Sequence, residues 1–160
     1  MYAIMDIEGI QISKEHICVR QMYILCQNGI SYFQDFVACN SYNELDLKYQ
    51  GSFNYCKKYV HHLEYNPRFI FSPDTCQSAQ NKLEEFIQAN NISIIFYKGG
   101  TIEKGLCASV GIHSYDIGDI VPKAFIHNPI CEVHSYFNYL NQHYTSIYID
   151  NIITNNIREK

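Results

Sequence analysis

The sequence predicts an α/β domain in which a mixed sheet begins with three antiparallel strands and carries helices on both faces. Two observations lead to this prediction. Residues 1–39 contain alternating apolar positions and a tight-turn signal at Asn28-Gly29, as in consecutive antiparallel strands. Beyond them, segments with helical spacing alternate with short apolar runs of the buried-strand type. This order of elements favours a mixed sheet with helices packed against it.

The expected elements can be placed along the chain. Strands are expected at residues 1–10, 16–26 and 30–39, followed by a helix within 42–65 that ends before Pro67. A second helix is expected between the start signal at Asp74 and the break at Asn90. A strand at 92–97, a helix capped by Thr101, a strand within 112–120 and a last helix from near Pro129 complete the order.

Length and composition are those of one globular domain. Of 160 residues, 47% are hydrophobic, and 14 Tyr and 9 Phe exclude a disordered linker protein. No fixed-period repeat divides the chain. We expect the domain to span residues 1–145, with a C-terminal helix or tail at 146–160.

Charge and cysteine usage narrow the classes of function. The formal net charge is −4, so a nucleic acid would have to be met by a local basic patch or a metal ion. Seven cysteines without close pairs indicate reduced thiols and an intracellular protein of the cytoplasm or nucleus. Asp6 and Glu8 interrupt the first apolar segment, and no stretch approaches membrane-spanning length. We therefore expect neither a signal peptide nor contact with a membrane.

Asp6-Ile7-Glu8 is the most informative short motif. Alternate side chains leave the same face of a strand, so both carboxylates can offer hard oxygen ligands to a divalent cation. Alternating acids are also common on half-exposed strands. The position of the motif on the first strand of the sheet is therefore more informative than its residue types alone.

In that position the motif resembles the opening of the proofreading-type 3′–5′ exonucleases, the DEDD group of the RNase H-like superfamily. That family has a second acid in a turn entering a helix after the fourth strand, where this chain has Glu103. Its last helix has a His followed five residues later by an Asp, where this chain has His127 and Glu132. The resemblance implies an RNase H-like fold and Mg²⁺ or Mn²⁺ held by Asp6, Glu8, Glu103 and Glu132. It also implies that His127 acts as general base.

A second resemblance is to the Maelstrom domain, a branch of the same fold in which Cys and His partly replace the acids. It rests on the segments Met5-Asp6-Ile7-Glu8-Gly9, Val60-His61-His62-Leu63 and Phe125-Ile126-His127, together with Cys131. The spacing of His127, Cys131 and His134 would also place all three on one side of a helix, where zinc could accept them. His61 or His62 would then be the fourth ligand. Buried Cys and capping His residues are equally ordinary, so zinc is an alternative.

Two hypotheses about function remain open, and a third lies beside them. The favoured one is a metal-dependent nuclease, a 3′–5′ exonuclease acting on single-stranded RNA or DNA, because its acids fall at separate places that the fold order would bring together. The other is a catalytically inactive domain that binds nucleic acid or a protein partner, with zinc as a structural element. The Glu residues at 103 and 132, one methylene longer than Asp, and the negative charge favour it. A pure protein-binding module is the third, because the chain is rich in aromatic residues.

Overall fold

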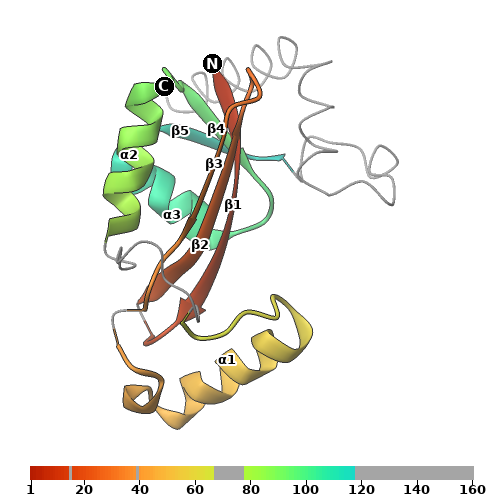
Figure 1. The fold of residues 1–160 in the computed structure, drawn as a ribbon, viewed down its shortest axis with the longest axis vertical. Coiled ribbons are helices and arrows are strands. Elements are labelled where there is room, and N and C mark those ends of the chain that lie inside the picture. Colours follow the sequence, from red (N-terminus) through yellow and green to blue (C-terminus); the bar gives the residue numbers. More distant parts are fainter. Residues whose placement is uncertain (15, 39, 67–77, 118–160) are drawn as a thin grey trace, which may run out of the picture.

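The computed structural model describes residues 1–14, 16–38, 40–66 and 78–117. Five strands form one mixed sheet in the order β3-β2-β1-β4-β5 (Figure 1). The strands are β1 (Tyr2–Gln11), β2 (Ile17–Cys26), β3 (Ser31–Asp35), β4 (Ile94–Tyr97) and β5 (His113–Asp116). The helices are α1 (Leu47–Tyr59), α2 (Ala79–Ala89) and α3 (Thr101–Val110), and a short 3-10 helix lies at Tyr42–Glu44. The predicted α/β class with a mixed sheet is confirmed.

Strand β1 is the centre of the sheet and has a different partner on each side. It is antiparallel to β2 along its whole length, and β2 is antiparallel to β3. On its other side β1 is parallel to β4, but only from Tyr2 opposite Ile94 to Ile4 opposite Phe96. Strand β5 continues the parallel part next to β4. The second half of β1 therefore extends past the carboxyl ends of β4 and β5.

A β-bulge interrupts the pairing of β1 with β2. The register shifts between Glu8 and Gly9, which leaves Arg20 as the extra residue on β2. Because strand side chains alternate, the extra residue allows both Val19 and Met22 to enter the same core. The alternation of β1 itself is kept, so the bulge changes the facing of β2 alone.

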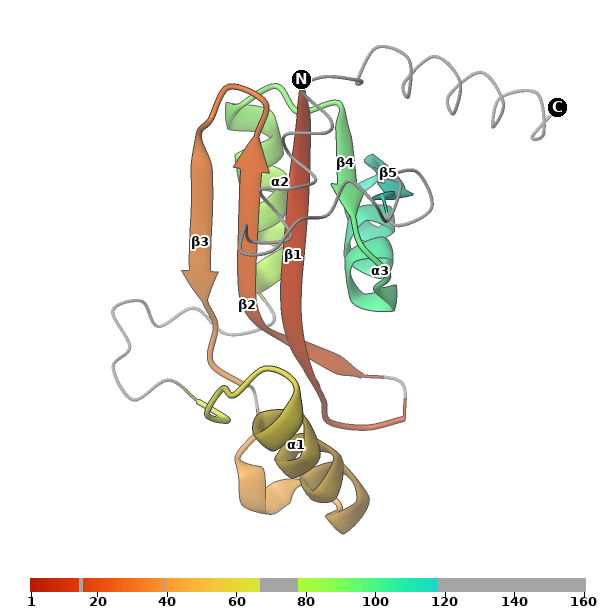
Figure 2. The ribbon, with the colours of Figure 1, turned by 90° about the vertical axis from the view of Figure 1, so that its right-hand side faces the viewer.

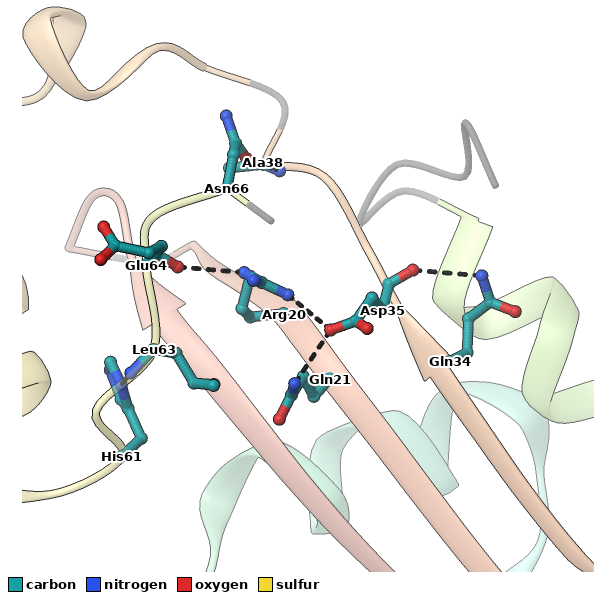
Figure 3. A network of polar contacts seen from close by, with 9 residues as sticks. All are labelled: Arg20, Gln21, Gln34, Asp35, Ala38, His61, Leu63, Glu64 and Asn66. Atoms are coloured by element: carbon teal, nitrogen blue, oxygen red, sulfur yellow. Dashed lines mark hydrogen bonds and ion pairs between the residues drawn. The ribbon is translucent and has the colours of Figure 1, made fainter. Parts of the chain in front are cut away.

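Arg20 is buried at 4% exposure and joins three segments (Figure 3). Its guanidinium donates to Asp35 Oδ1 of β3 at 2.9 Å and to the carbonyl of Glu64, after α1, at 3.2 Å. Gln21 donates to the same Asp35 oxygen at 2.9 Å. The bulge residue thus attaches the chain that follows α1 to the two strands.

Helices α2 and α3 cover one face of the sheet (Figure 2). The core there joins Met5 and Ile7 of β1 to Leu83 of α2 and Cys107 of α3. Leu83 and Cys107 are fully buried, so both helices contribute to the core, α2 through the apolar face that its spacing predicts. The end of α2 and both ends of β4 agree with the prediction to within about two residues, whereas the predicted start signal at Asp74 lies outside the described residues.

Helix α1 belongs to a second cluster beyond the end of the sheet (Figure 2). Tyr49 and Phe53 of α1 pack with Ile10 of β1 and with Tyr65. Ile10 alternates with the residues that enter the first core, so it lies on the face of β1 that Asp6 and Glu8 share. The helix expected near residue 129 and the tail at 146–160 lie outside the described residues. Helices on both faces of the sheet therefore stay a prediction.

Two boundaries differ from the prediction. Strand β3 ends at Asp35, and not at residue 39, because its ladder with β2 runs only as far as the bulge at Arg20. Helix α1 ends at Tyr59, well before Pro67, and His62 then takes a left-handed conformation with φ of 57°. Val60 consequently lies outside the helix and is 60% exposed, although its helical spacing from Phe53 and Cys56 predicts it on the buried face.

Two findings bear on the expectations from composition. Within the described ranges, no helix is both long and apolar enough to cross a membrane. None of the four cysteines described there forms a disulfide bond, and they are Cys18, Cys26, Cys56 and Cys107.

Candidate carboxylate site

Three of the predicted acids come together next to the carboxyl ends of β4 and β5. Asp6 and Glu8 lie on β1 just beyond its last pair with β4, and Glu103 lies in the first turn of α3, which follows β4. Burial is the largest cause of the raised pKa values of Glu8 and Glu103; the charge of Asp6 raises both further, and the charge of Glu103 raises the pKa of Glu8. The crossover from β4 into α3 thus brings residues distant in sequence to one place.

Glu103 is the buried member of the site, with 4% exposure. Its Oε1 accepts the backbone N–H of Ile7 at 3.1 Å. That N–H lies past the end of β4, so the carboxylate occupies the place of the strand carbonyl that is absent there. Burial raises the pKa of Glu103, while hydrogen bonds from its own N–H and from Ile7 oppose the rise. Glu103 therefore has a structural role at the edge of β1.

The approach of Glu103 depends on Gly100. A Cβ atom at Gly100 would overlap the Glu103 carboxyl group. Gly100 is also the N-cap of α3, and Thr101, which the sequence predicts as the cap, is the first helical residue. Because Thr101 lies inside the helix and not at its N-cap, its predicted role as the cap is wrong.

Asp6 and Glu8 are the accessible members of the site. Loss of solvation raises the pKa of both carboxyl groups and is the largest cause in each case. Asp6 is exposed as a whole residue, so for this group the enclosure is partial. The predicted placement of both carboxylates on one face of β1 agrees with the alternation of its burial pattern.

Asp116, the last residue of β5, is a fourth acid, and the sequence pattern did not single it out. Its Oδ2 accepts the N–H of Gly99 at 3.0 Å, in the turn between β4 and α3. Its charge also raises the pKa of Glu103. An acid at the carboxyl end of a parallel strand was the available signal, but only the pairing of β5 with β4 shows its neighbours.

The donor type of this site suits a hard divalent cation. Besides burial, the charges of Asp6 and Glu103 raise the pKa of Glu8, and a bound cation would relieve this repulsion. Across the part of the chain that the structure describes, no three His, Cys, Asp or Glu side chains are arranged to hold a metal ion. Mg²⁺, however, commonly uses one or two carboxylates and completes its shell with water and phosphate oxygens, which Asp6 and Glu8 could match. The other two predicted residues, His127 and Glu132, lie outside the described residues.

The alternative zinc set is described only in its first part. His61 follows α1, and its Nδ1 accepts the N–H of Leu63 at 2.9 Å. Burial lowers the pKa of His61, and the positive charges of Arg20 and His62 lower it further. A lowered pKa favours the neutral imidazole that zinc requires. The remaining members of the set, His127, Cys131 and His134, lie outside the described residues, so the zinc site stays a prediction.

Comparison with known proteins assigns no family to the chain. No protein-family model matches it, and no curated protein matches it in sequence.

Proposed function

We propose that this chain is an RNase H-like, metal-dependent nuclease domain that hydrolyses single-stranded nucleic acid from the 3′ end. The observation that carries the proposal is the meeting of Asp6, Glu8 and Glu103 beside the carboxyl ends of β4 and β5. Neighbouring carboxylates with raised pKa values at such an edge are typical of sites that bind cations or transfer protons. The order of three antiparallel strands followed by helices and parallel strands supports the same proposal.

Each acid would have a distinct role in this reaction. Asp6 and Glu8 would hold Mg²⁺ or Mn²⁺ through their accessible oxygens, and the bound ion would polarise the phosphate and activate water. Glu103 would orient this stretch of β1 through the Ile7 N–H and add negative charge behind the site. His127 as general base and Glu132 as a further ligand rest on the resemblance to the exonucleases.

The test is cleavage of 3′- and 5′-end-labelled single-stranded RNA and DNA by the full chain with Mg²⁺, Mn²⁺ or EDTA. We expect metal-dependent shortening from the 3′ end that Asp6→Asn and Glu8→Gln each abolish. Glu85→Gln is the matched control, because Glu85 is an exposed acid on α2. Shortening that survives EDTA, or that is unchanged in both β1 variants, would refute the proposal.

The second candidate is a catalytically inactive domain of the same fold that binds nucleic acid. Two observations favour it: Glu103 Oε1 is bound to the Ile7 amide, and no three-residue metal-binding group occurs in the described ranges. Binding of an oligonucleotide in EDTA, with no cleavage under any metal condition, would select this candidate over the nuclease.

A further inference from the structure

Helix α1 exposes an unusual number of large apolar side chains. It buries Tyr49 and Phe53, while on its other side Leu47 is 83% exposed, Tyr55 62% and Tyr59 60%. The two exposed tyrosines are one helical turn apart, and their ring centroids lie 5.0 Å from each other. A gathering of this kind on one helix indicates a binding surface.

The same side of α1 carries two exposed lysines, Lys48 and Lys58. The helix contains three lysines and no Asp or Glu in a protein of formal net charge −4. Lys57 is paired with Glu64 at 2.9 Å, whereas Lys58 lies with its Nζ 5.1 Å from the Tyr59 ring centroid. We define the outer face of α1 as Leu47, Lys48, Tyr55, Lys58 and Tyr59, all of which are exposed.

This helix is held close to the carboxylate site. Ile10, which packs against Tyr49 and Phe53, follows Glu8 by two residues on the same face of β1. Two residues of strand correspond to about 7 Å. The Arg20 bond to the Glu64 carbonyl also fixes the segment after α1 to the sheet (Figure 3). Helix α1 is therefore fixed near the acids, with its outer face on the side away from Ile10.

We propose that the outer face of α1 is a docking surface for single-stranded nucleic acid, with bases stacked on Tyr55 and Tyr59 and phosphates bound by Lys48 and Lys58. The carboxylate site repels a polyanion, and the protein as a whole has a net charge of −4. Lys48 and Lys58 provide positive charge locally. In single-stranded nucleic acid, the bases can stack on paired aromatic rings and the phosphates can bind the neighbouring cations. As a substrate-binding surface it rests on the proposed function, but its binding does not require cleavage.

The test is fluorescence anisotropy of a labelled dT20 or U20 oligonucleotide with the full chain in EDTA, so that no cleavage occurs. Each lost stacked base corresponds to about 5- to 150-fold in affinity, so we expect Tyr55→Ala/Tyr59→Ala, which removes both rings, to weaken binding by about 25-fold or more. Replacement of both residues by Phe should retain most of the affinity, because the rings remain. The plot of log K against log salt concentration has a negative slope. Lys48→Gln/Lys58→Gln should make this slope shallower by about 1.4, which is about 0.7 for each lost phosphate contact.

Two controls test whether a loss of binding comes from this surface itself. Lys82→Gln removes a lysine from α2, on the other face of the sheet, and should leave the salt slope unchanged. Circular dichroism should show that each variant is folded. Wild-type affinity in both the Tyr and the Lys variants would overturn the proposal. If they instead lost self-association in analytical ultracentrifugation, or binding to anionic vesicles, the face would belong to a second copy or a membrane. Loss of oligonucleotide binding in a chain without nuclease activity would keep this surface and remove only the catalytic proposal.

Discussion

Replacing Glu103 by Gln should make the protein more stable at neutral pH. The Glu103 side chain is 4% exposed, and burial together with the charges of Asp6 and Asp116 raises its pKa above the ordinary value of 4.5. A carboxyl with a raised pKa in the folded state binds its proton more tightly there than in the unfolded chain. Stability is therefore highest below the unfolded pKa and falls as pH rises through the folded pKa.

The size of the effect follows from this linkage. Every tenfold weakening of acid dissociation on folding corresponds to about 1.4 kcal/mol lost by the ionised wild type. Gln resembles the protonated acid and does not titrate, so Glu103→Gln should match the wild type near pH 4 and exceed its stability at pH 7.5. Glu103→Ala should be about 1–3 kcal/mol less stable than Glu103→Gln at both pH values, because it leaves the buried Ile7 N–H without its acceptor.

Urea unfolding followed by circular dichroism at pH 4 and pH 7.5, in EDTA, measures all three proteins. Glu85→Gln, on the exposed side of α2, is the control for a loss of charge without burial. The reasoning is refuted if the difference between Glu103→Gln and wild type does not change between the two pH values. Equal stability of the Ala and Gln variants would show that the Ile7 hydrogen bond contributes nothing.

Three further predictions concern the bulge, the turn before α3 and the proposed cation. Arg20→Met should lower the free energy of unfolding by about 1.5–3 kcal/mol, as expected for lost hydrogen bonds of a charged group, and denaturant unfolding would measure it. Gly100→Ala should lower the free energy of unfolding by about 1–3 kcal/mol, again measured by denaturant unfolding. Adding Glu103→Ala to this variant should restore part of the lost stability, because it removes the overlapping carboxyl group. Under the proposed function, Mg²⁺ should raise the melting temperature of the wild type in a concentration-dependent way and leave that of Asp6→Asn unchanged, as differential scanning fluorimetry would show.

The hydrophobic pattern predicted a strand or helix correctly wherever a single strand or helix period continued through the whole segment. The alternation through Asp6 and Glu8 predicts a strand with both acids on one face, and the spacing of Leu83 with its apolar neighbours predicts the buried side of α2. The pattern misplaces the end of α1, because a left-handed turn at His62 interrupts a spacing that continues in sequence. Sequence alone also grouped Glu103 with the β1 acids only through a family resemblance, and did not single out Asp116.

By itself, then, the sequence determined the α/β class, the main strands and helices, and the shared face of the β1 acids, since each depends on periodicities of two or about 3.6 residues along the chain. Only the tertiary structure decided that Arg20 bulges from β2, that Glu103 binds the Ile7 amide, and that Asp116 lies beside the same turn. It also decided that Tyr55 and Tyr59 remain outside the core. These features depend on the relative lengths and pairing of the strands and on which face of each helix packs against the sheet. Such long-range contacts leave no periodic signal in the sequence.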